Sequence, residues 1–312
     1  MNKLLILSAD AEQYFTLIKS ADLPQLEIKS TGDVTLAKSL IADCNIVLGD
    51  PSLVADVLDS ADRLEWVQSS WAGVDQLCKP GQRRDYILTT ARGIFGFLIS
   101  EYVTAYLFAL ERDLFRMRRN QLEQNWKPLA YRPASDIRLG IVGLGSIGRQ
   151  LALTARHFGM RVTGLNRSGK PCEEVDRVYT ADDIAGFLKN LDYVVLTLPA
   201  TRDTHHFIRS DTLKLMKSSA VLINVGRGNS VNETDLVRAL EEGLIGGAVL
   251  DVFESEPLAT DSPLWTIPNA YITPHMAATT FPDEIAGIFT GNYKRFLHKQ
   301  SLQHQVDFEL GY

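Results

Sequence analysis

Cysteine is scarce in this sequence of 312 residues, and lysine and arginine together do not outnumber the acidic residues. The 3 cysteines, Cys44, Cys78 and Cys172, form no CxxC pair, which argues against a disulfide framework and against a zinc site. Such usage is typical of a reducing compartment, so we expect a cytoplasmic protein. The formal net charge of -6 provides no overall basic surface, and we therefore expect neither nucleic acid nor anionic lipid as a partner.

Long apolar runs and metal-binding patterns are also missing. The apolar run at residues 4–7 ends at Ser8 and Asp10, which makes it too short for a secretory signal and favours a core strand. No later stretch is long and apolar enough to span a bilayer, so we expect no membrane partner. We expect no metal, because five histidines have no partner at metal-ligand spacing: His157, His205, His206, His298 and His304. We find no internal repeat and no low-complexity segment.

The composition that is present, 45% hydrophobic and 22% charged, suits a chain with a large core and favours two domains. Short aliphatic runs alternate with helical patterns, which is typical of βαβ units that build parallel sheets. Four strands are expected in the N-terminal third, at residues 4–7, 45–48, 66–68 and 87–89. A second series of strands is expected at residues 138–142, 161–165, 193–198, 220–225, 248–252 and 271–273.

Helical patterns organise the rest of the chain. Residues 97–124 contain neither glycine nor proline and predict one long helix between two domains, with a cationic part at residues 112–119 that suits a solvated face or a subunit contact. Residues 232–242 read as a helix capped by Asn232 and ended by Gly243. A last helix from Pro282 to about residue 299 would carry the chain back to the first domain.

A glycine-rich turn follows the strand at residues 138–142. Gly143 would make the tight turn, Gly145 would let the backbone approach a pyrophosphate, and Gly148 would let the next helix pack against the strand. The amide groups at the start of that helix, where Ser146 and Ile147 lie, would then meet the anion. The alternative is a purely structural turn, but the strand and helix around it favour a dinucleotide site.

The end of the next strand predicts which dinucleotide binds. An NAD-selective site places an acid about 20 residues after the glycines, whereas Asn166 stands there in this sequence. Arg167, Ser168 and Lys170 follow and could hold a 2′-phosphate, so we expect a preference for NADPH, with NAD as the alternative cofactor. The competing interpretation is an exposed polar turn without a role in binding.

Three later strands end in polar residues, and the carboxyl ends of parallel strands face the ligand crevice of such sheets. Reducing a 2-oxo acid needs a cation for the carboxylate, a proton donor for the carbonyl oxygen and a group that keeps this donor charged. Arg227, His275 and Glu256 suit these three tasks. Glu254 is the competing carboxylate, and each residue taken alone could equally be structural.

In order and spacing, these motifs resemble the D-isomer-specific 2-hydroxyacid dehydrogenase family, which carries an Asn-x-x-Arg-Gly, an Asp-Val-Phe-x-x-Glu-Pro and a Thr-Pro-His after its glycine turn. The resemblance covers nearly the whole chain and favours Glu256 over Glu254. It adds a loop near the nicotinamide, from Pro199 to Thr204, and a substrate loop at residues 70–75. Within the family, residues 90–103 and Trp71 are most similar to the bacterial glyoxylate/hydroxypyruvate reductases of the A type.

The resemblance implies contacts that the spacing alone does not. Pro199, Thr204 and Asp251 would contact the cofactor, and the backbone around Ala72 and Gly73 would bind the substrate carboxylate together with Arg227 and His275. Trp71 would narrow the pocket, so the leading substrates are glyoxylate, reduced to glycolate, and hydroxypyruvate, reduced to D-glycerate. The alternatives are another 2-oxo acid, or a nucleotide-sensing protein without activity on the same fold.

The expected fold is α/β, with two Rossmann-like domains that each contain a parallel sheet. Residues 1–98 and 283–312 would form a flavodoxin-like, split substrate domain, and residues 99–282 the dinucleotide-binding domain. The family resemblance and the apolar surface of the helix at residues 97–124 imply a homodimer.

Overall fold

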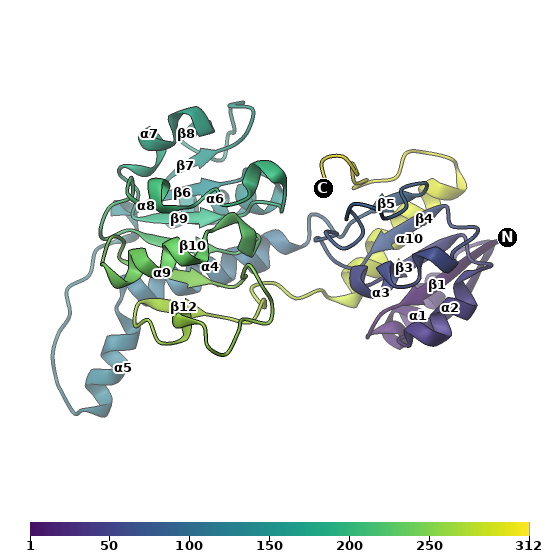
Figure 1. The fold of residues 1–312 in the computed structure, drawn as a ribbon, viewed down its shortest axis with the longest axis horizontal. Helices are drawn as coiled ribbons and strands as arrows, with labels where there is room; N and C mark the ends of the chain where they lie inside the picture. Colours follow the sequence, from purple (N-terminus) through teal and green to yellow (C-terminus); the bar gives the residue numbers. More distant parts are fainter. Residues whose placement is uncertain (312) are drawn as a thin grey trace. The chain divides into compact units, whose positions relative to one another are not determined.

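The computed structural model describes residues 1–311 and divides into two compact units (Figure 1). The first unit comprises Met1–Ile94 and Thr280–Tyr312, and the second comprises Phe95–Thr279. The chain thus leaves and re-enters the first unit after residues 94 and 279, compared with the expected boundaries after residues 98 and 282. Each unit contains one sheet in which all strand pairs are parallel, so the expected α/β class is confirmed.

The sheet of the first unit has the strand order β2-β1-β3-β4-β5, which is the flavodoxin-like order expected for this domain. Its strands are β1 (Asn2–Leu7), β2 (Leu26–Thr31), β3 (Ile46–Gly49), β4 (Trp66–Ser69) and β5 (Ile87–Thr89). The helices of this unit are α1 (Ala11–Ser20), α2 (Val34–Ile41), α3 (Pro51–Ala55) and α10 (Pro282–Leu297). Strand β2 was missed by the sequence analysis, because it lies at the edge of the sheet and all six of its residues are half-buried.

Aromatic stacking fixes the last helix to the first unit. The ring of Trp66 in β4 lies 5.1 Å from that of Phe289 in α10, and the two planes are nearly parallel. The indole Nε1 of Trp66 donates a hydrogen bond to Thr89 Oγ1 at 2.8 Å, which satisfies the polar atom of a fully buried side chain. Helix α10 thus packs on the sheet of the first unit.

The second unit has seven strands in the order β12-β11-β10-β9-β6-β7-β8. They are β6 (Arg138–Val142), β7 (Arg161–Leu165), β8 (Arg177–Tyr179), β9 (Tyr193–Leu196), β10 (Val221–Asn224), β11 (Gly247–Leu250) and β12 (Ala270–Ile272). The helices are α4 (Phe95–Glu111), α5 (Leu114–Leu122), α6 (Ser146–His157), α7 (Ile184–Leu188), α8 (Ser210–Leu213) and α9 (Glu233–Glu241). The first strand of this sheet, β6, lies inside it. The chain adds β7 and β8 on one side and β9 to β12 on the other, so the strand order reverses between β6 and β9. Ligands bind at this switch point in doubly wound sheets.

The prediction of one long helix at residues 97–124 is wrong, because this segment forms two helices, α4 and α5. Asp113 adopts a left-handed backbone conformation with φ 53°, which ends α4 without glycine or proline. Helix α5 has no buried residue and projects from the body of the second unit (Figure 1). Residues 112–132 are called the arm below. Its exposed apolar side chains are Leu114, Phe115, Met117, Leu122, Trp126 and Tyr131.

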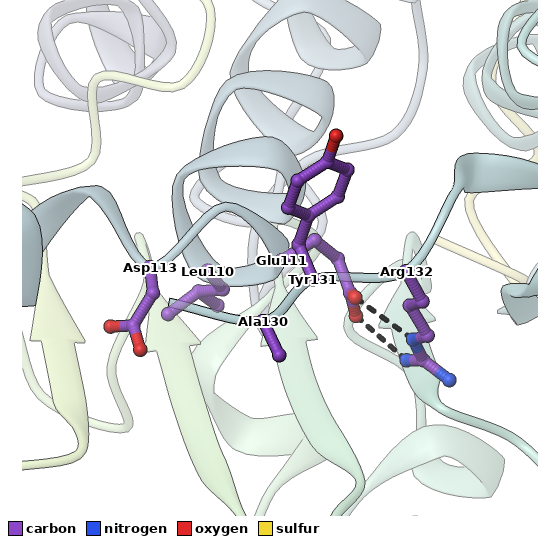
Figure 2. Close-up of a pocket in the computed structure, with 6 residues that line it drawn as sticks. All are labelled: Leu110, Glu111, Asp113, Ala130, Tyr131 and Arg132. Atoms are coloured by element: carbon purple, nitrogen blue, oxygen red, sulfur yellow. Dashed lines mark hydrogen bonds and ion pairs between the residues drawn. The ribbon is translucent and has the colours of Figure 1, made fainter. Parts of the chain in front are cut away.

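An ion-pair network holds the base of the arm. Arg132 donates to both carboxylate oxygens of Glu111, at 2.7 and 2.8 Å, and also pairs with Asp192 at 3.2 Å. Glu111 and Arg132 line a pocket of about 340 Å³ together with Leu110, Asp113, Ala130 and Tyr131 (Figure 2). None of the predicted site residues lines this pocket, and we interpret it as part of the anchor of the arm.

Candidate active site

The glycine turn connects β6 to α6, and each of its three glycines meets a different constraint. Gly143 has φ 99°, a conformation that a side chain would strain. A Cβ on Gly148 would lie 2.0 Å from the carbonyl oxygen of Gly143, so only glycine allows this approach of helix to strand. A Cβ on Gly145 would meet nothing within 4 Å, because this residue faces open space.

This turn fits a pyrophosphate. The open space at Gly145 lies at the N-terminus of α6, where exposed Ser146 and half-buried Ile147 form the first turn and backbone amides lack helical partners. At the end of β9, Thr197 Oγ1 donates to the carbonyl oxygen of Gly143 at 2.8 Å and fixes the turn at the switch point. Thr197 is a residue that the sequence analysis missed.

The end of β7 forms a compact polar turn. Asn166 Oδ1 accepts a hydrogen bond from Gly169 N at 2.7 Å, and Asn166 Nδ2 donates to the carbonyl oxygen of Lys170 at 3.3 Å. The amide of Asn166 therefore shapes the turn. Arg167, Ser168 and Lys170 are all exposed around it, so the two cations are available to an anionic group.

The loop after β9 is held by the side chain of Thr204. Its Oγ1 donates to the carbonyl oxygen of Pro199 at 2.6 Å and accepts from Thr201 N at 2.9 Å. Thr204 thus fixes the conformation of the segment expected near the nicotinamide.

The turn after β10 carries Arg227 and lies against the segment after β11. Asn224 Nδ2 and Ser230 Oγ donate to the carbonyl oxygen of Arg227, at 3.0 and 2.7 Å. A Cβ on Gly228 would lie 1.8 Å from the carbonyl carbon of Phe253, so this position requires glycine. The close approach places the turn that carries Arg227 beside the loop that carries Glu256.

His275 and Glu256 form an ion pair across the ends of β11 and β12. His275 Nδ1 lies 2.7 Å from Glu256 Oε2, and Glu256 Oε1 accepts a hydrogen bond from Phe253 N at 3.0 Å. The hydrogen bond to Glu256 raises the pKa of His275, against the opposing effects of burial and of the Arg227 charge. Burial acts to raise the pKa of Glu256, but the hydrogen bonds from His275 and Phe253 outweigh it and leave this pKa below its usual value. Both shifts favour the charged forms of the pair.

Asp251 holds the backbone turn on which His275 stands. His275 has φ 51°, an uncommon conformation for a residue other than glycine, and its N–H donates to the carbonyl oxygen of Asp251 at 2.8 Å. The buried carboxylate of Asp251 accepts from Thr273 Oγ1 and from the N–H groups of Met276 and Ala277, at 2.6 to 2.9 Å. These contacts stabilise the strained backbone turn at His275.

Glu254, the competing carboxylate, lies on a different partner. Its Oε1 is 3.0 Å from Nε2 of His206 and accepts from Glu233 N at 3.0 Å. Two glutamates of one loop thus pair with histidines of two other loops. The pair of Glu254 with His206 was missed by the sequence analysis, because His206 lies 48 positions from Glu254 and no spacing pattern connects them.

The predicted substrate loop belongs to the first unit. Trp71 is 48% exposed and Ala72 is exposed as well, while Gly73 is half-buried. Ser69 Oγ accepts from Trp71 N at 3.0 Å and donates to Trp71 O at 2.8 Å, and Ala91 N also donates to Trp71 O. Behind the loop, Ser70 Oγ donates to the buried carboxylate of Asp50 at 2.5 Å. The loop is therefore held from its own backbone and leaves its outer face accessible.

Within residues 1–311, no helix combines the length and the hydropathy that a membrane span requires. In the same part of the chain, no group of three histidine, cysteine or acidic side chains is arranged to hold a metal ion.

Comparison with a family model gives a match over residues 104–277, to the NAD binding domain of D-isomer specific 2-hydroxyacid dehydrogenases. A glyoxylate reductase from Pyrococcus horikoshii is 33% identical over 261 residues, which cover 80% of this chain and 77% of that protein.

Two solved structures extend the similarity to the whole chain. A D-isomer specific 2-hydroxyacid dehydrogenase family protein from Aeromonas salmonicida is 45% identical with a TM-score of 0.94, covering 98% of this chain and 99% of that one. An NADPH-dependent glyoxylate/hydroxypyruvate reductase from Sinorhizobium meliloti, solved with NADP and sulfate, is 27% identical with a TM-score of 0.89 and covers 100% of both chains.

Proposed function

Because the chain belongs to the D-isomer specific 2-hydroxyacid dehydrogenases, which are NAD(P)-dependent enzymes, we propose that it reduces small 2-oxo acids with NADPH. The leading substrates are glyoxylate, which would give glycolate, and hydroxypyruvate, which would give D-glycerate. The observation that carries the proposal is the contact of 2.7 Å between His275 Nδ1 and Glu256 Oε2 beside the turn of Arg227.

The three side chains divide the chemistry among them. Glu256 occupies Nδ1 of His275, so the second ring nitrogen, Nε2, is left to give its proton to the carbonyl oxygen of the substrate. The hydrogen bond to Glu256 raises the pKa of His275 and so favours the protonated imidazole. Arg227 binds the substrate carboxylate with its planar guanidinium and stabilises charge that develops on the carbonyl oxygen.

The cofactor site would be formed by the glycine turn and the end of β7. Amides at the start of α6 bind the pyrophosphate, and Arg167 with Lys170 binds a 2′-phosphate. Pro199, Thr204 and Asp251 lie on the segments that would border the nicotinamide. When bound, the reduced nicotinamide supplies the hydride for the carbonyl carbon. The relative from Sinorhizobium meliloti was solved with NADP, which supports this preference.

The substrate class follows from the loop of the first unit. Backbone amides around Ala72 and Gly73 bind the carboxylate, and the large side chain of Trp71 excludes long substrates. A panel of glyoxylate, hydroxypyruvate, pyruvate and longer 2-oxo acids, followed by cofactor absorbance at 340 nm, tests this proposal. We expect the highest kcat/KM with the first two acids. Absence of turnover with every acid, together with tight NADPH binding, would instead indicate a nucleotide-sensing protein.

The arm supports a homodimer as the assembly. Leu122 and Trp126 are 68% and 98% exposed and lie among other exposed apolar side chains of the arm. A second copy of the chain would cover them. Light scattering after size exclusion tests this, with Leu122→Glu/Trp126→Glu as the disruptive variant. Leu36→Glu, at a leucine of the first unit that is 50% exposed, is the matched control. A wild-type monomer, or a dimer that survives the double substitution, would contradict an assembly through the arm.

A further inference from the structure

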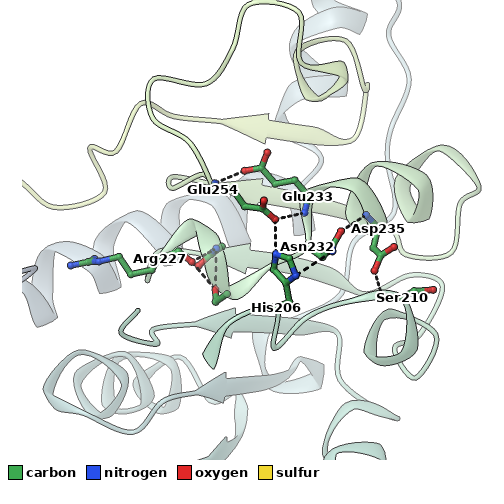
Figure 3. A network of polar contacts seen from close by, with 9 residues as sticks. His206, Ser210, Arg227, Asn232, Glu233, Asp235 and Glu254 are labelled. Carbon is green, nitrogen blue, oxygen red and sulfur yellow. Dashed lines mark hydrogen bonds and ion pairs between the residues drawn. The ribbon is translucent and has the colours of Figure 1, made fainter. Parts of the chain in front are cut away.

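A cluster of polar side chains connects three successive loops at the carboxyl end of the second sheet. We call His206, Asn232, Glu233 and Glu254 the Glu254 cluster (Figure 3). Glu254 Oε1 contacts His206 Nε2 and Glu233 N, both at 3.0 Å, and Glu254 N donates to Glu233 Oε1 at 2.6 Å. Glu233 and Glu254 therefore bind each other twice, each through its backbone N–H and its carboxylate.

The cluster is joined to two of the three segments that carry the proposed catalytic residues, those of Glu256 and Arg227. Glu254 stands two positions before Glu256 in the loop after β11. His206 N donates to the carbonyl oxygen of Asn229 at 2.8 Å, which lies in the turn that carries Arg227. Figure 3 shows the side chain of Arg227 pointing away from the cluster, so the connection runs through the backbone.

We propose that Glu254 is a positioning residue, which holds the loop so that Glu256 meets His275 and which fixes the distance of this pair from the turn of Arg227. This inference rests on the proposed function, because it assigns Glu254 a part in the same reaction. The hydrogen bonds of Glu254 go to His206 and Glu233 and not to Glu256 or His275. Glu254 would therefore act only through the backbone of its loop.

The local geometry makes the placement of Glu256 sensitive to this anchor. Glu256 Oε1 accepts from Phe253 N at 3.0 Å, so the carboxylate is set by the turn from Phe253 to Glu256. Glu254 N, inside this turn, is fixed by Glu233. Releasing Glu254 frees the turn on one side, and small displacements of a catalytic group lower rates strongly.

Carboxylates of like charge lie close together in the Glu254 cluster, so its formation costs electrostatic free energy. Burial first, and then the charges of Glu254 and Glu256, raise the pKa of Glu233. Three carboxylates thus lie near one another at the start of α9, where the positive end of the helix dipole offsets part of their repulsion. The side chains of His206 and Glu254 are 29% and 37% exposed, so their pair contributes little to global stability, and variants should remain folded.

The test compares Glu254→Ala, Glu254→Gln and Glu256→Gln, the double variant Glu254→Ala/Glu256→Gln, and the matched control Ser255→Ala, an exposed neighbour in the same loop. Titration of His275 by NMR, with ¹³C-labelled histidine and His275→Gln for assignment, reports the pair without any turnover. Thermal melting of every variant verifies folding.

We expect Glu254→Ala to lower the pKa of His275 towards its value in Glu256→Gln, with Glu254→Gln between Glu254→Ala and wild type and Ser255→Ala unchanged. In the Glu256→Gln background, the Glu254 substitution should have no further effect, because its route through Glu256 is already removed. An unchanged pKa in Glu254→Ala would overturn the inference. An equal shift in both backgrounds would overturn it too, since that indicates a direct electrostatic effect on His275.

Turnover separates this inference from the proposed function. With glyoxylate and NADPH, we expect Glu254→Ala to lose about 10- to 100-fold in kcat, as misplacement of a catalytic group does. A wild-type protein that reduces no 2-oxo acid refutes the proposed function, while the NMR titration still decides whether Glu254 positions Glu256. An active wild type with a fully active Glu254→Ala variant refutes the positioning role alone.

Discussion

Replacing Glu256 with glutamine removes the negative charge that faces Nδ1 of His275 at 2.7 Å and keeps the size of the side chain. A hydrogen bond to a charged group contributes about 1.5–3 kcal/mol. The side chains of His275 and Glu256 are 51% and 36% exposed, so solvent screening favours the lower end of this range. Because about 1.4 kcal/mol corresponds to a factor of ten in rate, we expect kcat to fall about tenfold.

The pH profile gives the sign of the effect. Glu256 raises the pKa of His275, so the protonated imidazole that donates the proton persists to higher pH in the wild type than it would alone. In Glu256→Gln, the decline of kcat/KM with rising pH should therefore begin at lower pH. His275→Ala removes the donor itself and should cost about 100- to 10,000-fold in kcat at pH values below the alkaline decline of the wild type, the usual range for general acid catalysis.

Initial rates of NADPH oxidation with glyoxylate, measured from pH 5 to pH 9, check both variants. Light scattering and thermal melting serve as folding controls. A Glu256→Gln enzyme with the alkaline limb of the wild type would refute the role of Glu256. A His275→Ala enzyme that keeps near-normal turnover would refute the proton-donor assignment.

Further predictions concern the other side chains of the site. Arg227→Ala should raise KM for the 2-oxo acid and lower kcat about 100- to 1,000-fold, with Arg227→Lys in between, and steady-state kinetics that change neither constant would contradict its role. Arg167→Ala should lower the ratio of NADPH to NADH efficiency about tenfold or more, and an unchanged ratio would remove the phosphate contact. Gly148→Ala should have a lower melting temperature, because overpacking costs about 1–3 kcal/mol of stability, and it should also bind NADPH more weakly. Gly145→Ala, which meets nothing within 4 Å, should keep its melting temperature and lose only NADPH affinity in a fluorescence titration. Equal affinity in Gly145→Ala and wild type would place the pyrophosphate elsewhere.

Buried strands were predictable from the sequence, and polar edge strands were not. β1, β3 and β9 are aliphatic runs whose central residues are fully buried, and their hydrophobicity alone marks them. β2 and β8 pair on one side only, and their charged or half-buried residues show neither an apolar run nor a regular alternation. Their position depends on neighbours that a local pattern does not contain.

Backbone reversals without glycine also escaped prediction. Asp113 ends α4 in a left-handed conformation, and His275 adopts the same region because Asp251 binds the amides that follow it. At the glycine turn, by contrast, the residue type itself expresses the constraint, so Gly143 and Gly148 could be interpreted from the sequence.

In the candidate site, too, some features follow from local sequence patterns and others depend on contacts that only the fold creates. Arg227, Glu256 and His275 lie in the segments that follow β10, β11 and β12, so the topology of a parallel sheet brings these segments to one edge. Contacts beside these residues come from far away in sequence. The hydroxyl of Tyr102 lies 2.6 Å from that of Thr273, 171 positions away, and His206 hydrogen-bonds Glu254, 48 positions away. Such contacts depend on side-chain geometry, and a linear motif carries no information about them.

The stereochemistry of the product tests the central claim most directly. Hydroxypyruvate and NADPH are incubated with the purified protein, and the glycerate that forms is resolved by chiral chromatography and compared with the NADPH consumed. We predict D-glycerate in a ratio of one to one with oxidised cofactor, formed at least about 100-fold more slowly by His275→Ala. Formation of L-glycerate, or consumption of NADPH without glycerate, would contradict the proposed reaction.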